Sequence, residues 1–260
     1  MMRAHSPFRN VAAVMYREYK IRITSFTWLF YDLALPAFYL LLFGIGLNTA
    51  FTDGVAVGGS VISYNAFFLA GVLSMAGFGI AINTSYGFFV DRDNGIFYEF
   101  LTYPMTRGEF LFGKILFSLC ITTVQSAITV AIGVAVLRVQ ISLPLLPLLF
   151  LANAVCTAGW FFCLSIFALR IRRNDLYNTV INVAYFVLMF ASSIFFPLDN
   201  SPVWLKILAG ANPLTWHTDI LRYLSVGTGE ANTVLLQCAA YAVFAVAVFI
   251  GGVRALRASA

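Results

Sequence analysis

The sequence predicts an all-α polytopic membrane protein, with six transmembrane helices, an N-terminal amphipathic interface helix, and two short re-entrant helices between spans five and six. Two observations carry this prediction. The 260 residues are 61% hydrophobic and only 10% charged, with a mean hydropathy of +0.87, whereas soluble domains carry about 25% charged residues. The apolar residues also gather in long blocks, which suits helices in a bilayer. The alternation of apolar and polar residues that a transmembrane β-barrel needs is absent from these blocks.

The segment before the first apolar block, FRNVAAVMYREYKIRI, predicts an amphipathic helix over residues 8–24. Its apolar residues recur at steps of three and four, which is the period of one helix face. These residues are Phe8, Val11, Met15, Tyr19 and Ile23. We expect the helix to lie flat on the membrane, with basic residues on another face toward lipid headgroups. Those basic residues are Arg9, Arg17 and Lys20. A basic tail that only sets topology is the alternative.

Six apolar blocks predict the membrane spans of a single domain over residues 1–260. Each block reaches about 20 residues, the length a helix needs to cross the hydrocarbon core of ~30 Å. The second block is longer than required, so we expect it to tilt or to project beyond the bilayer. The predicted spans cover residues 26–47, 61–90, 110–137, 144–169, 176–196 and 233–253.

The positions of Lys and Arg predict the orientation. With six spans both termini share one side, and that side carries all but three of the 16 Lys and Arg residues. The three exceptions are Arg138, Lys206 and Arg222. Because cytoplasmic loops are enriched in Lys and Arg, we expect both termini in the cytoplasm. The net charge of +5 is then explained by topology and contact with anionic membrane lipid, and nucleic acid is not an expected partner.

The stretch between the second and third spans, FYEFLTYPMTRGEFLFGK, is unusually charged for so apolar a chain. Its ionisable residues are Glu99, Arg107, Glu109 and Lys114. We expect a cytoplasmic segment over residues 91–106 that contains a short helix over 96–103, ended by Pro104. An apolar face of Phe97, Phe100 and Leu101 would fill a groove on a partner, and Glu99 would pair with a partner Arg at the rim. An ordinary solvated loop is the alternative.

The segment after the fifth span, residues 197–229, is too apolar for an ordinary loop but is interrupted by helix breakers. Pro202 is expected to open a short helix that stops near Gly210. Asn212 can then cap a second helix, with Pro213 at its first position, where the missing N–H costs nothing. Two short helices that dip into the outer leaflet fit this pattern. A seventh span is the weaker alternative.

Residues that would carry catalysis or hold a metal are not expected in this chain. The four cysteines lie in predicted spans without ligand spacing, and His217 has no second imidazole or carboxylate cluster beside it. No GxxxxGK[ST] phosphate loop is found, so the chain has no visible means of holding a nucleotide. Asp32 is an intramembrane acid, which is functional by default. Its place near the cytoplasmic end favours a structural pairing with headgroups or with an Arg of the interface helix.

Three of these features together resemble the membrane subunits of type 2 ABC exporters, and most closely the small six-span bacterial permeases that move drugs or glycolipids. The first is the basic helix before the first span, and the second is GIFYEFLTYPMTRGEFLFGK. The third is FFPLDNSPVWLKILAGANPLTWHTDILR, with its Asn-Pro-Leu-Thr core and final Arg222. The resemblance covers essentially the whole chain, and the third motif is the specific one.

The resemblance implies a permease of the bacterial inner membrane that works as a homodimer or pseudo-dimer. Each copy would dock on a separate cytoplasmic ABC ATPase, which would hold ATP and magnesium, so this chain would carry no cofactor. The cargo would be an amphipathic drug, lipid-linked glycan or glycolipid, exported by alternating access.

The resemblance and the residue pattern together give three sets of predicted site residues. Coupling to the ATPase is expected at Arg92, Asp93, Gly95, Phe97, Glu99, Phe100, Tyr103, Pro104 and Arg107. The translocation path is expected to include Asn83, Ser85, Asn178 and Asn182. A re-entrant gate is expected at Phe196, Pro197, Asn212 and Pro213.

Two other classes of function remain open from the residues alone. An ion-coupled secondary transporter would need titratable groups near the midplane and often shows an internal repeat. Asp32 lies off-centre and no clear repeat is seen, so support for this class is poor. A membrane anchor subunit without transport is the third class. It would differ from a permease in leaving the activity of a partner ATPase unchanged.

Overall fold

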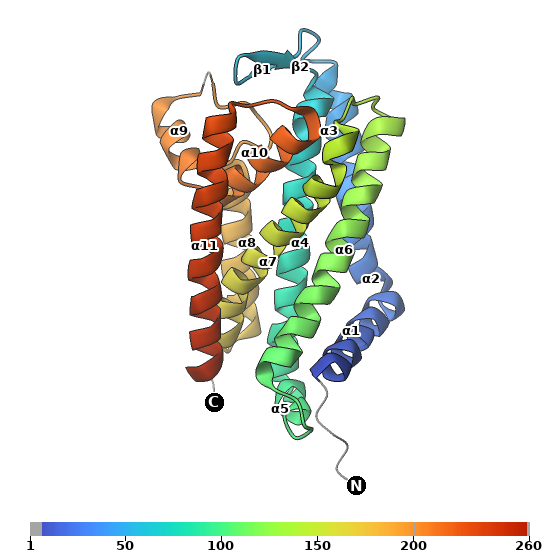
Figure 1. The fold of residues 1–260 in the computed structure, drawn as a ribbon, viewed down its shortest axis with the longest axis vertical. Helices are drawn as coiled ribbons and strands as arrows, with labels where there is room; N and C mark the ends of the chain where they lie inside the picture. Colours follow the sequence, from blue (N-terminus) through green and yellow to red (C-terminus); the bar gives the residue numbers. More distant parts are fainter. Residues whose placement is uncertain (1–6, 200, 259–260) are drawn as a thin grey trace.

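Five helical segments in the described part of the chain, residues 7–199 and 201–258, are long and apolar enough to cross a membrane. They are Phe26–Asn48, Tyr64–Asp93, Arg107–Ala135, Leu143–Arg170 and Ala231–Leu256. This computed structural model therefore confirms the all-α membrane class (Figure 1). The fifth predicted span is a shorter helix, α8 (Asn174–Phe190, 17 residues).

The first span is preceded by helix α1 (Pro7–Thr24), close to the predicted interface helix. The span itself is continuous but irregular, because a π-helical turn, η1 (Phe30–Ala34), separates α2 (Phe26–Leu29) from α3 (Leu35–Asn48). Single π-turns inside helices are rare and are frequently found at functional sites.

A β-hairpin that the sequence analysis missed joins the first and second spans. Strand β1 (Val55–Val57) pairs antiparallel with β2 (Ser60–Ile62), and Val57 lies opposite Ser60. The turn is Gly58-Gly59, with φ of 54° and 80°, the left-handed geometry that a two-residue hairpin turn needs. The prediction that residues 61–90 form the second span was therefore wrong at its start. Ser63 caps the helix by accepting from the Ala66 N–H, and the helix begins at Tyr64.

Helix α4 (Tyr64–Asp93) is the central element of the molecule. Its most apolar stretch is 89% buried inside the protein, and α3, α6 (Arg107–Ala135), α7 (Leu146–Arg170) and α10 (Pro213–Val226) all pack on it. A one-turn 3₁₀ helix, η2 (Leu143–Leu145), leads into α7. The last helix, α11 (Ala231–Ala258), lies at the edge, with 6% of its most apolar stretch buried. An apolar helix this exposed is suited to contact lipid.

Helix α5 (Ile96–Phe100) forms the link between α4 and α6 and is shorter than predicted. Residues 91–93 were expected in this link but continue α4, and Gly95, at φ 78°, makes the left-handed turn that starts α5. The start of α1, helix α5 and the end of α11 lie at one end of the bundle, and the hairpin lies at the other (Figure 1). The two ends therefore carry different elements.

The segment after α8 contains the two predicted short helices, α9 (Val203–Gly210) and α10. Pro202 precedes α9, and the Asn212 side chain accepts from the Leu214 N–H, so the predicted cap of α10 is confirmed. The Asn212 amide also donates to the carbonyls of Leu188 and Ala191, at 2.7 and 3.0 Å. The predicted fifth span, 176–196, ends early at Phe190, because this amide takes over the carbonyls that further helical turns would have used.

Candidate functional site

Helix α1 is held against α4 and α6 by a buried ionic cluster that consists of Arg17, Glu18, Asp91 and Lys114. The Lys114 Nζ lies 2.7 Å from Glu18 Oε1 and 2.6 Å from Asp91 Oδ2. The Arg17 Nη1 donates to Asp91 Oδ2 at 2.9 Å and to Glu18 Oε1 at 3.0 Å. The Lys114 side chain is only 1% exposed. Two cations and two anions neutralise each other. Charges are tolerated in a site this buried when they are paired in this way.

Arg17 lies in α1, at the edge of this cluster, and is the most exposed of its members. Burial lowers the pKa of its guanidinium, but the hydrogen bond and the charge of Asp91 raise it by more, so the pKa lies above its ordinary value. Arg17 was predicted to face lipid headgroups, and this was wrong, because Asp91 holds it against the bundle. Arg9 and Lys20 are exposed, as expected of a helix at an interface.

Most of the apolar stripe predicted on α1 is exposed, although Val11 and Met15 are half-buried. Phe8 is 85% exposed and Ile23 is 54% exposed, whereas the residues that α1 buries are Val14, Glu18 and Arg22. Helix α1 therefore packs on the bundle through Val14 and its charged side chains, and leaves the outer part of its apolar stripe exposed. Such a face is suited to the acyl boundary of a membrane.

A second ionic link joins the end of α1 to the first span. Arg22 Nη1 lies 3.0 Å from Asp32 Oδ2, in an ion pair without hydrogen-bond alignment, and its guanidinium lies 5.0 Å from the centre of the Trp28 ring. The other Asp32 oxygen accepts from the Asn83 amide of α4 at 2.8 Å. The pairing predicted between Asp32 and an Arg of the interface helix is confirmed. Asp32 lies in the π-turn, so the irregular turn carries the carboxylate that α1 and α4 share.

Beside this link lies a cavity of about 470 Å³, between the first span, α4 and α8. Its wall is mainly aromatic and aliphatic. Its aromatic residues are Trp28, Tyr31, Tyr39, Tyr86, Tyr177 and Tyr185. Its polar side chains include Asn83, Asn178 and Asn182. An apolar wall with a few polar groups is typical of small-molecule sites.

The structure thus brings together three of the four predicted path residues. Asn83 comes from α4, and Asn178 and Asn182 come from one face of α8. Ser85 does not line the cavity, because its hydroxyl is buried against the Tyr177 hydroxyl at 2.9 Å. Its position two residues after Asn83 puts it on another face of the helix.

The apolar face predicted to fill a groove on a partner packs instead on this chain. Phe97 is 1% exposed and its ring lies 5.5 and 5.4 Å from those of Phe88 and Phe110. The Phe100 ring lies 5.3 Å from that of Phe110, so this residue also faces inward. An apolar side chain near water buries itself in its own core when one is within reach. The link between α4 and α6, residues 94–106, forms an elbow. Its exposed side chains include Tyr98, Glu99, Thr102 and Tyr103.

The predicted coupling residues on either side of α5 mostly tie helix ends together. Arg92 donates to the carbonyls of Ala168 and, at 2.7 Å, Ile171, at the C-terminal end of α7. Arg107 donates to the Leu256 carbonyl of α11 at 3.0 Å. These cations satisfy carbonyls that a helix end leaves free.

Two further coupling residues lie on either side of α5. Asp93 is exposed at the end of α4. The Pro104 carbonyl accepts from Asn10 of α1 at 2.7 Å. The elbow is thereby joined directly to the interface helix.

Of the four predicted gate residues, Asn212 and Pro213 form the start of α10, as described above. Phe196 and Pro197 lie in the irregular segment between α8 and α9. Pro197 lines a second cavity at the hairpin end of the molecule.

Sequence reasoning missed the ionic cluster and most of the aromatic wall. Asp91 and Lys114 stand near the ends of two neighbouring spans and have opposite charge, which was a usable sign of pairing. Glu18, on the interface helix, had no such sign because its neighbours in sequence are polar as well. The tyrosines of the wall were hidden among many other aromatic residues in the spans.

Comparisons with known proteins identify similar sequences. The family model described as ABC-2 type transporter matches residues 9–225. The chain is 28% identical over 195 residues to a protein of Cyanophora paradoxa named as a transport permease, ycf38, and the alignment covers 73% of this chain. It is 27% identical over 168 residues, 63% of this chain, to a protein of Escherichia coli K12 named as a multidrug ABC transporter permease, YbhR. The alignments span 64% and 44% of these relatives' own lengths, so less than two thirds of either.

Proposed function

We propose, because the chain belongs to the ABC-2 type transporter family, that it is the permease subunit of an ATP-driven exporter in a bacterial inner membrane. The cargo would be an amphipathic molecule, such as a drug, a lipid-linked glycan or a glycolipid. The single observation that carries this proposal is the family match over residues 9–225. The cavity of about 470 Å³ supports it, since aromatic rings and three asparagines accommodate both parts of an amphipathic molecule.

The topology we propose has six spans, with α8 as the fifth. A helix of 17 residues covers about 25 Å, which is short of the ~30 Å hydrocarbon core, and local thinning of the bilayer accommodates such a difference. Both termini then lie in the cytoplasm with α5, where Lys and Arg are concentrated. Helices α9 and α10 would re-enter the outer leaflet, with protein covering their backbone.

The free energy for transport would come from a separate cytoplasmic ATPase that binds ATP and magnesium. It would hold the exposed surface of the elbow, Tyr98, Glu99, Thr102 and Tyr103. Motion of the elbow has a short route to the cavity. It passes through Pro104 and Asn10 into α1, and then through Arg22 and Asp32 to Asn83 on the cavity wall. A rigid element with two positions is what such coupling requires.

A second copy of the chain would complete the path. Helix α8 buries only Tyr177 and Ile181, while Asn182, Val183 and Phe186 are exposed, with Phe186 at 61%. A polar Asn182 facing lipid is unfavourable, whereas a polar residue at a helix–helix contact finds a partner. A homodimer that joins two α8 helices would therefore cover this face and close the open side of the cavity.

Asp32 gives no support to the ion-coupled alternative. Its carboxylate is already shared between Arg22 and Asn83. A proton carrier needs a carboxyl group that changes its charge during the cycle. The ion pair and the hydrogen bond instead give Asp32 a structural role, which is to join α1, the first span and α4.

Reconstitution with a partner ABC ATPase tests the proposal. Glu99→Gln and Pro104→Ala should each lower substrate-stimulated ATP hydrolysis severalfold in proteoliposomes. The first removes an exposed charge of the elbow. The second keeps the carbonyl that accepts from Asn10 but removes the ring that fixes the backbone at this point. Membrane insertion should be unchanged. Lys206→Gln, on exposed α9, is the matched control at the opposite end.

Full stimulation in both elbow variants would contradict the coupling role. ATP hydrolysis that does not change when this chain is added would contradict the permease role. The mass of the purified complex is expected to equal that of two permease chains and two ATPase chains.

A further inference from the structure

A second cavity, of about 280 Å³, lies at the hairpin end of the molecule, away from α5. The hairpin turn, the segment between α8 and α9, α10 and the start of α11 enclose it. Its polar side chains include Ser193, Asp199, Asp219, Arg222, Thr228, Glu230 and Gln237. The proposed path above does not use this cavity. Its volume is near the lower limit of ligand pockets, about 300 Å³.

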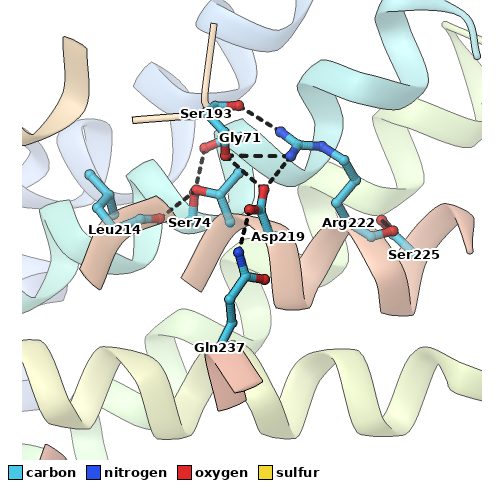
Figure 2. A network of polar contacts seen from close by, with 9 residues as sticks. Gly71, Ser74, Ser193, Leu214, Asp219, Arg222, Ser225 and Gln237 are labelled. Atoms are coloured by element: carbon cyan, nitrogen blue, oxygen red, sulfur yellow. Dashed lines mark hydrogen bonds and ion pairs between the residues drawn. The ribbon is translucent and has the colours of Figure 1, made fainter. Parts of the chain in front are cut away.

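The floor of the cavity is a fixed polar network centred on Asp219 (Figure 2). Its carboxylate accepts from Arg222 at 2.5 Å, from Ser193 at 2.7 Å and from the Gln237 amide at 2.8 Å. Arg222 also donates to the Ser193 carbonyl at 2.7 Å, and its guanidinium lies 4.2 Å from the centre of the Phe67 ring. The floor thus joins α10, α11 and the segment after α8 in one rigid arrangement.

Three buried polar atoms on this cavity have no hydrogen-bond partner among the described residues. They are Arg222 Nε, Gln237 Oε1 and Thr228 Oγ1. Arg222 is 3% exposed and Thr228 is 6% exposed, so water outside the protein does not readily satisfy them. Buried polar groups in folded proteins are almost always hydrogen-bonded. One donor, one acceptor and one hydroxyl left free around the same small space are suited to a ligand that carries several hydroxyl groups.

The rim of the cavity is acidic. Asp199 and Glu230 are exposed carboxylates, and neither forms an ion pair with a described residue. Lys206 lies nearby but donates to the main-chain carbonyl of Asp199, at 2.6 Å. The residues that line the cavity include three carboxylates, Asp199, Asp219 and Glu230, and a single guanidinium, that of Arg222. A metal ion does not fit, because no group of three His, Cys, Asp or Glu side chains in the described residues is placed to hold one.

We propose that this cavity binds a small hydroxylated amine, with its ammonium group at the acidic rim and its hydroxyl groups on the floor. One hydroxyl of the ligand would accept from Arg222 Nε, another would donate to Gln237 Oε1, and a third would pair with Thr228. The ammonium group is attracted by Asp199 and Glu230. This site does not depend on the transport function proposed above, because it needs neither the ATPase nor the first cavity.

Binding of D-glucosamine to the purified chain tests this inference. The chain is placed in nanodiscs of phosphatidylcholine, whose headgroup has no primary amine, and binding is followed by calorimetry and by the midpoint of thermal unfolding. Saturable binding of glucosamine is expected, with at least tenfold weaker binding of N-acetylglucosamine and of glucose, because each lacks the cation. Equal binding of all three sugars, or of none, would overturn the inference.

Variants locate the site. Glu230→Gln at the rim and Thr228→Val on the floor should each weaken glucosamine binding by about tenfold, since each removes one polar contact. Asp53→Asn is the matched control, because Asp53 is an exposed carboxylate beside the hairpin that does not line the cavity. Thr228→Val preserves shape, so its unfolding midpoint without ligand should equal that of the parent. Unchanged binding in both variants, or the same loss in Asp53→Asn, would place the sugar elsewhere and refute the site.

Discussion

Lys114 is the residue at which three helices meet. It belongs to α6, and its ammonium group bonds Glu18 of α1 and Asp91 of α4 at 2.7 and 2.6 Å. A lysine that is 1% exposed and has no partner would cost much free energy. The burial of Lys114 therefore depends on its two carboxylate partners. The residue that closes the third motif, Arg222, plays a comparable part at the other end, where it fixes Asp219 and Ser193.

Replacing Lys114 by Met should therefore destabilise the chain by about 3 to 5 kcal/mol, because Glu18 and Asp91 lose the cation that lies between them. The measurement is thermal unfolding in detergent, in which the midpoint should fall clearly. Lys206→Met, at an exposed lysine, should change stability by no more than about 0.5 kcal/mol. Adding Asp91→Asn to Lys114→Met should restore part of the loss. Equal midpoints in Lys114→Met and Lys206→Met would show that the cluster contributes little.

Helix α1 is the element whose position depends most on one small residue. A Cβ atom added to Gly113 of α6 would lie 2.6 Å from the Val14 Cβ and 3.0 Å from the Val11 carbonyl oxygen. These distances are too short for atoms that belong to two packed helices. The close approach is what allows Glu18 and Arg17 to reach the ends of α6 and α4. A small residue at a helix contact in a membrane typically serves this purpose.

Gly113→Ala should accordingly push α1 away from α6 and lengthen the ion pairs of the cluster. If α1 carries motion from the elbow to the cavity, ATP hydrolysis stimulated by substrate should fall severalfold, with insertion preserved. Gly46→Ala is a fair comparison, since a Cβ at Gly46 meets nothing within 4 Å, and it should keep full stimulation. Normal coupling in Gly113→Ala would mean that α1 only anchors the protein.

At the scale of the whole molecule, the two ends of the bundle differ in charge and in structure. The end with α5 carries most of the Lys and Arg residues, and the ionic cluster lies near it. The opposite end carries the hairpin, α9 and the acidic rim of the second cavity. The topology proposed above, with the α5 end in the cytoplasm, rests on this charge difference.

A labelling experiment checks this orientation. In a variant whose four cysteines are replaced by alanine, Asp53→Cys should react with a membrane-impermeant maleimide in intact spheroplasts. Glu99→Cys should react only after the membrane is opened. Both positions are exposed in the structure, so a difference in labelling reports the side of the membrane and not burial. Labelling of Glu99→Cys from outside would reverse the topology and remove the basis for ATPase coupling.

The sequence by itself determined the membrane class, the family and the approximate extent of most helices, because the bilayer demands long apolar helices and Lys and Arg mark their ends. It also predicted the Asn212 cap and the Pro202 start, which depend on neighbouring residues alone. Only the tertiary structure decided which charges pair. Arg17, Asp91 and Lys114 come from three helices, and no local pattern measures the distance between helices. The same reason turned Phe97 inward and Ser85 away from the cavity, since a side chain's surroundings are supplied by segments far away in the sequence.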